Sequence, residues 1–163
     1  MKLFNALLAA ALMSVSFGAV AHEDHGKKKA ESVKKEQKDW GIAGEAKVAK
    51  RTIEIAMTDN MRFTPDKIEV KQGETIKFVI KNNGTMMHEM VIGTKKVLEE
   101  HAALMMKFPN MEHDEPYMAH VKAGRTEKMT WKFTNPGTFL YGCLVAGHFE
   151  AGMKGKVVVA AVK

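Results

Sequence analysis

Residues 141–159, YGCLVAGHFEAGMKGKVVV, contain the only cysteine of the 163-residue chain. A strand-like run leads into Cys143, and a glycine-containing loop then carries His148 and Met153 at five-residue steps. The valine-rich run that follows predicts another β-strand. Because a loop closed between two neighbouring strands brings its ends together, these three side chains are expected to point at one place.

Outward from this loop, the chain from Arg51 onward reads as short strands separated by turn signals. The runs with strand character are RTIEIAM (51–57), KIEVKQGETIKFVIKN (67–82, broken by a turn at Gln72 and Gly73), HEMVIG (88–93), TEKMTWKF (126–133), GTFLYGC (137–143) and KGKVVVAAV (154–162). Pro65 suits an edge strand or a loop. Short strands with turn signals and a single helix predict an all-β fold, an antiparallel sandwich or barrel.

One segment changes to helical spacing. Residues 94–108, TKKVLEEHAALMMKF, place apolar side chains on one face, with Thr94 suited to be the N-cap. The apolar face is expected to contain Val97, Leu98, His101, Leu104 and Met105. A long connection, PNMEHDEPYMAH (109–120), follows this short inserted helix.

The N-terminus has the layout of an export signal. Residues 1–21 contain one early lysine, an apolar stretch too short to span a bilayer, and an A-x-A site that ends at Ala21. We therefore predict a cleaved signal peptide over 1–21 and a periplasmic, not membrane-embedded, mature protein. Residues 22–50 are charged and poor in large apolar residues, which predicts a flexible arm with Trp40 pinning its end to the domain. The folded domain is expected over 51–163.

Composition restricts the function classes. The chain has 25 Lys and Arg against 19 Asp and Glu. Without Lys2 the balance is 24 against 19, a formal charge of +5. The lysines are interspersed with acids and no aromatic–basic stripe accompanies them, so nucleic-acid binding is not expected. A single cysteine cannot form an internal disulfide, which leaves Cys143 as an inert buried thiol, an intermolecular link or a metal ligand.

Copper is the metal that suits the residues of the quoted loop. Thiolate and thioether are soft ligands, imidazole also binds copper, and two histidines with a cysteine and a long axial methionine form an electron-transfer site. The second imidazole must come from elsewhere in the sheet. His88 is the candidate, since it opens the strand HEMVIG after the turn KNNGT.

At these residues the chain resembles the cupredoxins, the blue-copper family with a Cys…His…Met loop before the last strand and a histidine far upstream. The resemblance covers 51–163 and implies a Greek-key β-sandwich. It also implies one type 1 copper with His88, Cys143 and His148 as equatorial ligands and Met153 as the axial ligand. The arm, the HEMVIGT strand and the methionine-rich middle are similar to periplasmic cupredoxins associated with copper tolerance.

Two residues depart from the family pattern. Many cupredoxins have asparagine after the upstream histidine, where its side chain ties the two ligand segments together, whereas this chain has Glu89. The residue before His88 is Met87, not the glycine whose carbonyl adds a fifth contact in azurins, so four ligands are expected. Contacts around the sulfur tune such a site, so Glu89 leaves its potential and colour open.

Further methionines and histidines suggest a second, weaker copper site. Eleven of the 13 methionines remain once Met1 and Met13 are removed with the signal. Thioether and imidazole are ligands that Cu(I) favours. The candidates in the helix-following segment are Met111, His113, Met118 and His120, while Met90, Met105 and Met129 are expected to fill the core. If cleavage follows Ala21, His22 at the new N-terminus is a further candidate, with a solvated tail as the alternative.

The expected function follows from a metal site that its protein ligands fill. Such a site has no open position for substrate, so we do not expect an enzyme. We expect a monomer that handles copper, supports copper tolerance and transfers single electrons to a redox or copper-transfer partner protein. The alternative is a dedicated soluble electron carrier between respiratory or photosynthetic partners. An apolar docking patch near His148 is expected to contain Leu144, Val145, Ala146, Phe149 and Met86.

Overall fold

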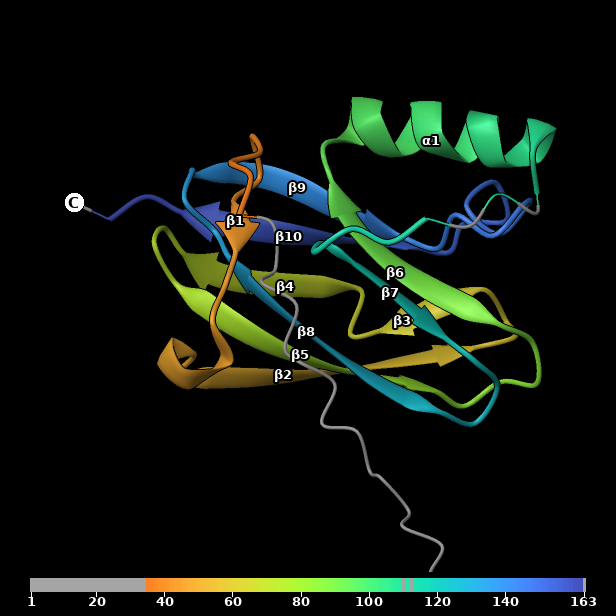
Figure 1. Ribbon diagram of the computed structural model, residues 1–163, viewed down its shortest axis with the longest axis horizontal. Helices are drawn as coiled ribbons and strands as arrows, with labels where there is room; N and C mark the ends of the chain where they lie inside the picture. The colour runs from red at the N-terminus through yellow and green to blue at the C-terminus, as the bar shows by residue number, and fades with distance from the viewer. Residues whose placement is uncertain (1–34, 110, 112, 163) are drawn as a thin grey trace, which may run out of the picture. The chain divides into compact units, whose positions relative to one another are not determined.

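The computed structural model describes residues 35–109, 111 and 113–162, and the strands in this part of the chain form two facing sheets (Figure 1). The first sheet has the order β1-β8-β5-β2-β3, with β1 (Ile42–Ala43), β2 (Arg51–Thr58), β3 (Arg62–Thr64), β5 (Thr75–Asn82) and β8 (Thr126–Lys132). The second has the order β4-β10-β9-β6-β7, with β4 (Lys67–Lys71), β6 (His88–Gly93), β7 (Met118–Val121), β9 (Gly137–Gly142) and β10 (Lys154–Ala160). The predicted β-sandwich is confirmed.

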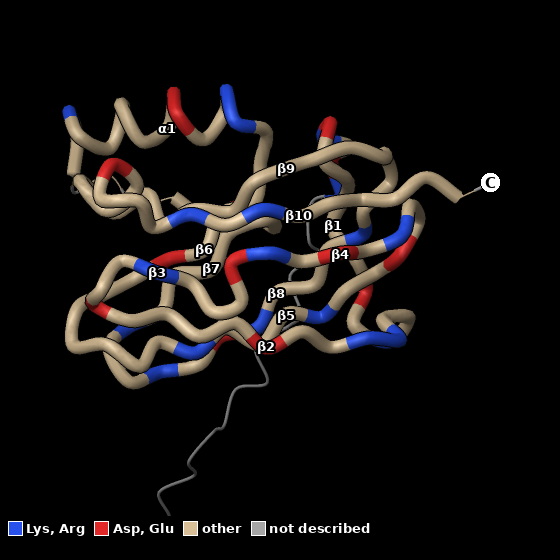
Figure 2. Tube along the Cα trace, turned by 180° about the vertical axis from the view of Figure 1, so that it is seen from behind, with Lys and Arg blue, Asp and Glu red and all other residues tan. Residues whose placement is uncertain are grey.

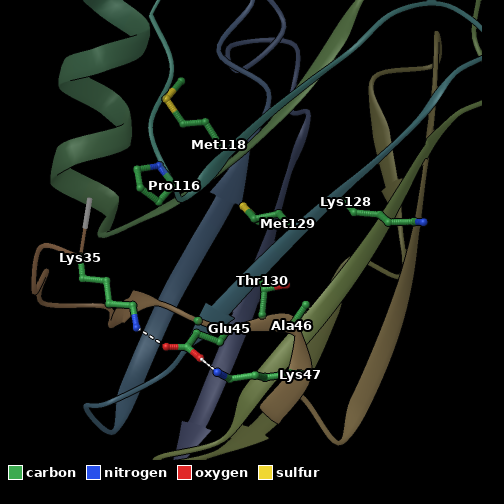
Figure 3. Close-up of a pocket in the computed structure, with 10 residues that line it drawn as sticks. Lys35, Glu45, Ala46, Lys47, Pro116, Met118, Lys128, Met129 and Thr130 are labelled. Atoms are coloured by element: carbon green, nitrogen blue, oxygen red, sulfur yellow. Dashed lines mark hydrogen bonds and ion pairs between the residues drawn. The ribbon is translucent and has the colours of Figure 1, made fainter. Parts of the chain in front are cut away.

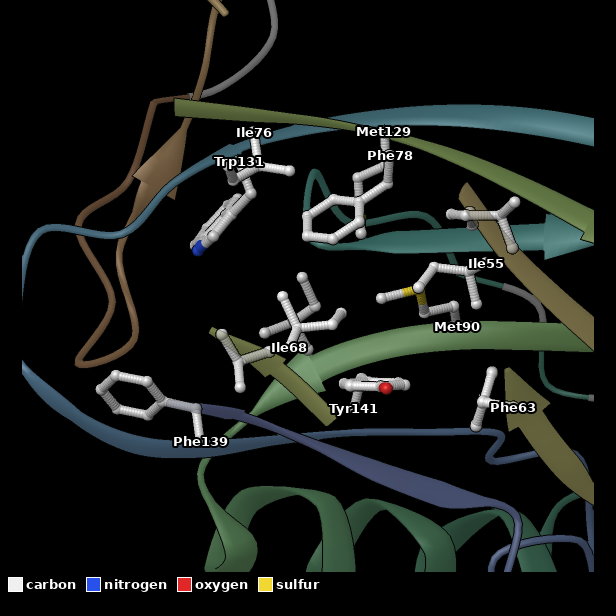
Figure 4. Packing of buried hydrophobic residues seen from close by; sticks show 14 of the residues in the cluster. Ile55, Phe63, Ile68, Ile76, Phe78, Met90, Met129, Trp131, Phe139 and Tyr141 are labelled. Atoms are coloured by element: carbon white, nitrogen blue, oxygen red, sulfur yellow. The ribbon is translucent and has the colours of Figure 1, made fainter. Parts of the chain in front are cut away.

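The core lies between the two sheets, where alternate residues of each strand point inward (Figure 4). In β5 the buried positions are Ile76, Phe78 and Ile80, and in β10 they are Val157 and Val159. Burial of each such side chain stabilises the fold by about 1.5–3 kcal/mol relative to exposure. The alternation seen in the sequence therefore identifies the inner face of each strand correctly.

The pairing of the strands is less uniform than an antiparallel sandwich. β2 pairs with β5 and β4 pairs with β10 in parallel, while the remaining ladders are antiparallel. The turn at Gln72 and Gly73 does not close a hairpin, because β4 and β5 belong to different sheets. A parallel pair needs a crossover connection, and β3 with β4 supplies it between β2 and β5. β7 lies at the end of the segment that was expected to be a connection.

The inserted helix α1 (Lys95–Lys107) covers the outer face of the second sheet (Figure 1). Thr94 caps it as predicted, since its side chain accepts a hydrogen bond from the backbone N–H of Val97. A second apolar cluster fills the space beneath it and consists of Val91, Leu98, Ala102, Met105, Met118, Leu144 and Phe149. Leu104, expected on the buried face, is exposed. With the helix on one side and the core on the other, every residue of β6 is buried.

The folded domain begins earlier than the expected boundary at residue 51. β1 pairs with β8, and a short 3-10 helix, η1 (Ala46–Val48), follows it. Trp40 is 4% exposed, and its carbonyl accepts a hydrogen bond from the indole N–H of Trp131. Trp40 thus anchors this end of the segment, as predicted, but part of the predicted arm belongs to the sheet. The predicted signal peptide lies outside the described residues.

Lys and Arg are interspersed among Asp and Glu along the chain (Figure 2). In β4 and β10 exposed charged residues alternate with buried residues. In β4, for example, Lys67, Glu69 and Lys71 are exposed, while Ile68 and Val70 are buried. Among the residues that the structure describes, no helix is both long and apolar enough to cross a membrane.

Candidate metal centre

Three of the four predicted ligands bring their donor atoms together at one end of the sandwich. His88 opens β6, Cys143 follows β9, and His148 lies in the loop between β9 and β10. The Nδ1 atoms of the two histidines are 3.2 Å apart, and the Cys143 Sγ lies 3.3 Å from Nδ1 of His148 and 3.9 Å from Nδ1 of His88. All three donor atoms lie within 4.8 Å of one another.

The fourth predicted ligand, Met153, ends the same loop and is fully buried. The backbone N–H of Cys143 donates to the carbonyl of Met153 at 3.0 Å, and the N–H of Met153 donates to the carbonyl of His148 at 3.0 Å. Gly147 adopts a φ of +85° inside the loop, a conformation that glycine takes without strain. These bonds hold the three loop residues close to one another, as their spacing predicts.

Asp59 orients the ring of His88, a contact that sequence reasoning missed. The Nε2–H of His88 donates to Oδ1 of Asp59 at 3.0 Å. The other ring nitrogen, Nδ1, then has a free lone pair, which faces Cys143. The Asp59 carboxylate is itself fixed by the backbone N–H and the hydroxyl of Thr85. These hydrogen bonds, led by the backbone N–H of Thr85 and joined by the ring N–H of His88, hold the pKa of Asp59 well below its usual range. Such a carboxylate–histidine pair is typical of metal ligands.

The protonation of the ligands suits a metal-binding site. Burial raises the pKa of the Cys143 thiol to about 12, against the lowering effect of hydrogen bonds from the N–H groups of Glu89 and Val145. A metal ion therefore has to displace the thiol proton. Burial, followed by the nearby His88, lowers the pKa of His148, so its imidazole is neutral near pH 7. A neutral imidazole is the form that binds metals.

Glu89 links the two ligand segments, the role that the family pattern assigns to an asparagine at this position. Its backbone N–H points at the Cys143 sulfur at 3.4 Å, and its Oε1 accepts a hydrogen bond from the N–H of Leu144 at 2.8 Å. Its other oxygen, Oε2, lies 3.0 Å from Nδ1 of His120. The departure from the family pattern therefore keeps the link between the two ligand segments and adds a charged partner.

The donor set fits a copper ion. Donors about 2.0–2.3 Å from a shared ion in a roughly tetrahedral site lie about 3.3–3.7 Å from one another, using the bond lengths typical of zinc sites. The separations among His88, Cys143 and His148 run from 3.2 to 3.9 Å. Two imidazoles, one thiol and a neighbouring thioether form the set that copper electron-transfer sites use.

Comparison with known proteins identifies the family. A family model described as copper binding proteins, plastocyanin/azurin family, matches residues 49–160. The chain belongs to this family. The chain is similar to the copper-resistant cuproprotein CopI of Rubrivivax gelatinosus, with 43% identity over 94% of this chain and 93% of the relative. It is also 31% identical to CopI of Pseudomonas aeruginosa, over 74% of this chain and 82% of the relative.

Solved structures agree with this cupredoxin assignment. Reduced auracyanin from the photosynthetic bacterium Roseiflexus castenholzii superposes with a TM-score of 0.58 at 28% identity, covering 67% of this chain and 96% of that one. The predicted family resemblance is thus confirmed over the domain that contains His88, Cys143, His148 and Met153.

The surface beside the centre differs from the predicted docking patch. Leu144 and Phe149 are buried in the cluster beneath α1, so they cannot contact a partner. Met86 and Met87, which precede β6, are 43% and 47% exposed. Val145 and Ala146 are half-buried. Met86, Val145 and Ala146 of the predicted patch therefore remain accessible, whereas Leu144 and Phe149 are covered.

The other predicted metal-binding residues fall into two groups. Met118 is buried beneath α1, and both ring nitrogens of His120 are engaged, Nδ1 by Glu89 and Nε2 by the carbonyl of His113 at 2.9 Å. The rings of His113 and His101 lie 4.6 Å apart, beside a hollow of about 350 Å³ that Met111 also lines. Sequence reasoning assigned His101 to the helix face only. The signal available in the sequence was the position of His101 on the apolar face of the helix, three residues after Leu98. His22 lies outside the described residues.

A hollow of about 650 Å³ lies away from the centre, between the β1–η1 segment and β8 (Figure 3). Its walls include Met118, Met129 and the side chain of Glu45. Glu45 is paired with Lys35 and Lys47, as the dashed lines in Figure 3 mark. Because its carboxylate is already neutralised by two lysines, this hollow offers no donor set comparable with that at His88.

Proposed function

We propose that the chain binds one copper ion in a type 1 site formed by His88, Cys143, His148 and Met153. The observation that carries the proposal is the convergence of two imidazole nitrogens and one thiol within 4.8 Å, beside a buried methionine. Copper held there would change between Cu(I) and Cu(II). The rigid sheets and the Asp59 and Glu89 contacts keep the ligands in place, which favours one-electron transfer with little rearrangement.

We further propose that this site serves copper handling and copper resistance in the periplasm. The relatives named copper-resistant cuproprotein support the resistance role. The predicted signal peptide over residues 1–21 supports the location. Four protein ligands leave no open position for a substrate, so the proposed function is binding and electron transfer, without enzymatic turnover. The partner is then a redox or copper-transfer protein that docks near the exposed Met86 and Met87.

The test of the site is spectroscopic. One equivalent of Cu(II) added to the metal-free mature protein should produce an intense thiolate-to-copper charge-transfer band, and Cys143→Ser should abolish it. Met106→Leu, a change at an exposed methionine of α1, is the matched control and should keep the band. A wild-type protein without this band would refute the type 1 site.

A dedicated electron carrier is the second candidate function, and the likeness to an auracyanin of a photosynthetic bacterium favours it. The two roles predict different effects of deleting the gene for this protein. Growth that fails only with added copper supports resistance. A respiratory or photosynthetic defect without added copper supports the carrier.

We also propose a second, weaker copper site at His101, Met111 and His113. Both ring nitrogens of His113 are shielded from solvent and lack a hydrogen-bond partner among the described residues. Burial lowers the pKa of the adjacent His101, which keeps that imidazole neutral. Two imidazoles and a thioether suit Cu(I). Titration should bind a second equivalent of Cu(I) that His113→Ala removes and Met106→Leu keeps. Binding of one equivalent only would refute this site.

A further inference from the structure

Glu89 links three segments of the second sheet, and the proposed copper site uses two of them. It follows His88 in β6, and it contacts the Cys143–Leu144 segment through its backbone N–H and through Oε1. Its Oε2 reaches His120 in β7. Glu89 is only 3% exposed. Because a buried charge is costly unless it is paired, this arrangement requires a compensating group next to the carboxylate.

His120 supplies that compensation as a cation. Its Nε2 lies 2.9 Å from the carbonyl of His113, which can only accept a hydrogen bond. Its Nδ1 lies 3.0 Å from the carboxylate of Glu89, which also accepts. Both ring nitrogens must therefore carry a hydrogen, and that is the imidazolium form. The hydrogen bond to Glu89 raises the pKa of His120 to about 9, in agreement with this geometry.

We propose that Glu89 and His120 form a positioning pair that holds the Cys143–Leu144 segment and sets the preference of the site for Cu(II) over Cu(I). The inference rests on the proposed type 1 site. A carboxylate next to a ligand favours the more highly charged ion, and the imidazolium beyond it offsets part of that effect. In the described part of the chain, the side chain of His120 contacts Glu89 and the carbonyl of His113 but none of the four proposed ligands. Its influence on the copper site therefore passes through Glu89.

The test is a double-mutant cycle on the reduction potential at pH 7.5. His120→Asn keeps a donor near the position of Nδ1 but removes the charge, so the preference for Cu(II) should rise about tenfold, a fall of about 59 mV for one electron. Glu89→Gln should shift the preference about threefold the other way. Without the carboxylate the His120 imidazole has no charge to compensate and becomes neutral, so the loss of the farther positive charge cancels part of the larger effect of losing the nearer negative one. In the Glu89→Gln background, His120→Asn should change the preference less than about twofold. Met106→Leu, at the exposed methionine of α1, is the control and should leave the potential unchanged.

A second readout needs no metal. In the metal-free protein, hydrogen exchange at the Leu144 amide should be at least about threefold faster in Glu89→Gln, because a neutral acceptor replaces a charged one. Three results would each overturn the proposed positioning pair. The potential could shift in the same direction in both single variants, His120→Asn could have equal effects in both backgrounds, or exchange of the Leu144 amide could stay unchanged. Absence of the charge-transfer band in the wild type would instead refute the type 1 site, and the Leu144 exchange would still decide whether Glu89 holds the segment.

Discussion

Binding of Cu(II) to the metal-free protein should release close to one proton from Cys143. Burial raises the pKa of this thiol to about 12, which is five units above pH 7. The thiolate fraction at pH 7 is then on the order of 10⁻⁵, and forming the thiolate costs about 7 kcal/mol, five times 1.36 kcal/mol. The copper–thiolate bond has to exceed that cost. Between pH 7.5 and 9 the apparent affinity should therefore rise about tenfold per pH unit.

The assay is isothermal titration calorimetry in two buffers with different protonation enthalpies. Cu(II) is delivered as a weak glycine complex, and the difference between the buffers gives the number of protons released. Cys143→Ser should lose the thiol proton and the pH slope together. His148 contributes little in this window, because the lowered pKa of its imidazole leaves it neutral already.

One result would refute the reasoning. If the wild type forms the charge-transfer band and releases fewer than about 0.3 protons, the thiolate exists before the metal binds. Burial would then not be the dominant influence on Cys143, and the N–H groups of Glu89 and Val145 would outweigh it. Met106→Leu is the control and should release as many protons as the wild type.

Three further predictions concern single residues. Asp59→Ala should weaken copper binding about 10–100-fold in a competition titration, because the His88 ring loses its orienting partner. In the metal-free protein, His120 should contribute on the order of 2 kcal/mol to the free energy of unfolding below pH 6.5, and this contribution should disappear as the pH rises through about 9, because folding raises its pKa. Gly155→Ala should destabilise the fold by about 1–3 kcal/mol in denaturant unfolding, because a Cβ there would lie 2.3 Å from the Tyr141 ring.

Each prediction has a contrary outcome. Copper affinity that falls equally in Asp59→Ala and in the exposed control Asp39→Ala would argue against orientation of His88. If the free energy of unfolding of the wild type stays constant from pH 6.5 to 9 and equals that of His120→Asn, the ion pair between His120 and Glu89 does not stabilise the fold. An unchanged midpoint in Gly155→Ala would mean that the Tyr141 ring moves aside at no cost.

Much of the fold and of the site could be predicted because the signals are local. Alternating apolar residues mark the inner faces of strands such as β5 and β10, and Thr94 marks the start of α1. Cys143, His148 and Met153 share one loop, so their spacing alone brings them together. These features depend on neighbours within a few residues, and the sequence displays such neighbours directly.

From the sequence alone came the sandwich, the inserted helix and four candidate ligands, three of which bring their donor atoms together in the structure. Which sheet each strand joins, that β7 is a strand, and what surrounds the candidate ligands depend on how the two sheets pack. Asp59 meets His88 across 29 positions, and Leu144 meets Glu89 across 55. Such partners are chosen by strand register and by the helix that covers β6, and no periodicity along the chain records either. For the same reason the sequence alone left Glu89 as an unexplained departure, whereas the packed sheets make it the link between Cys143 and His120.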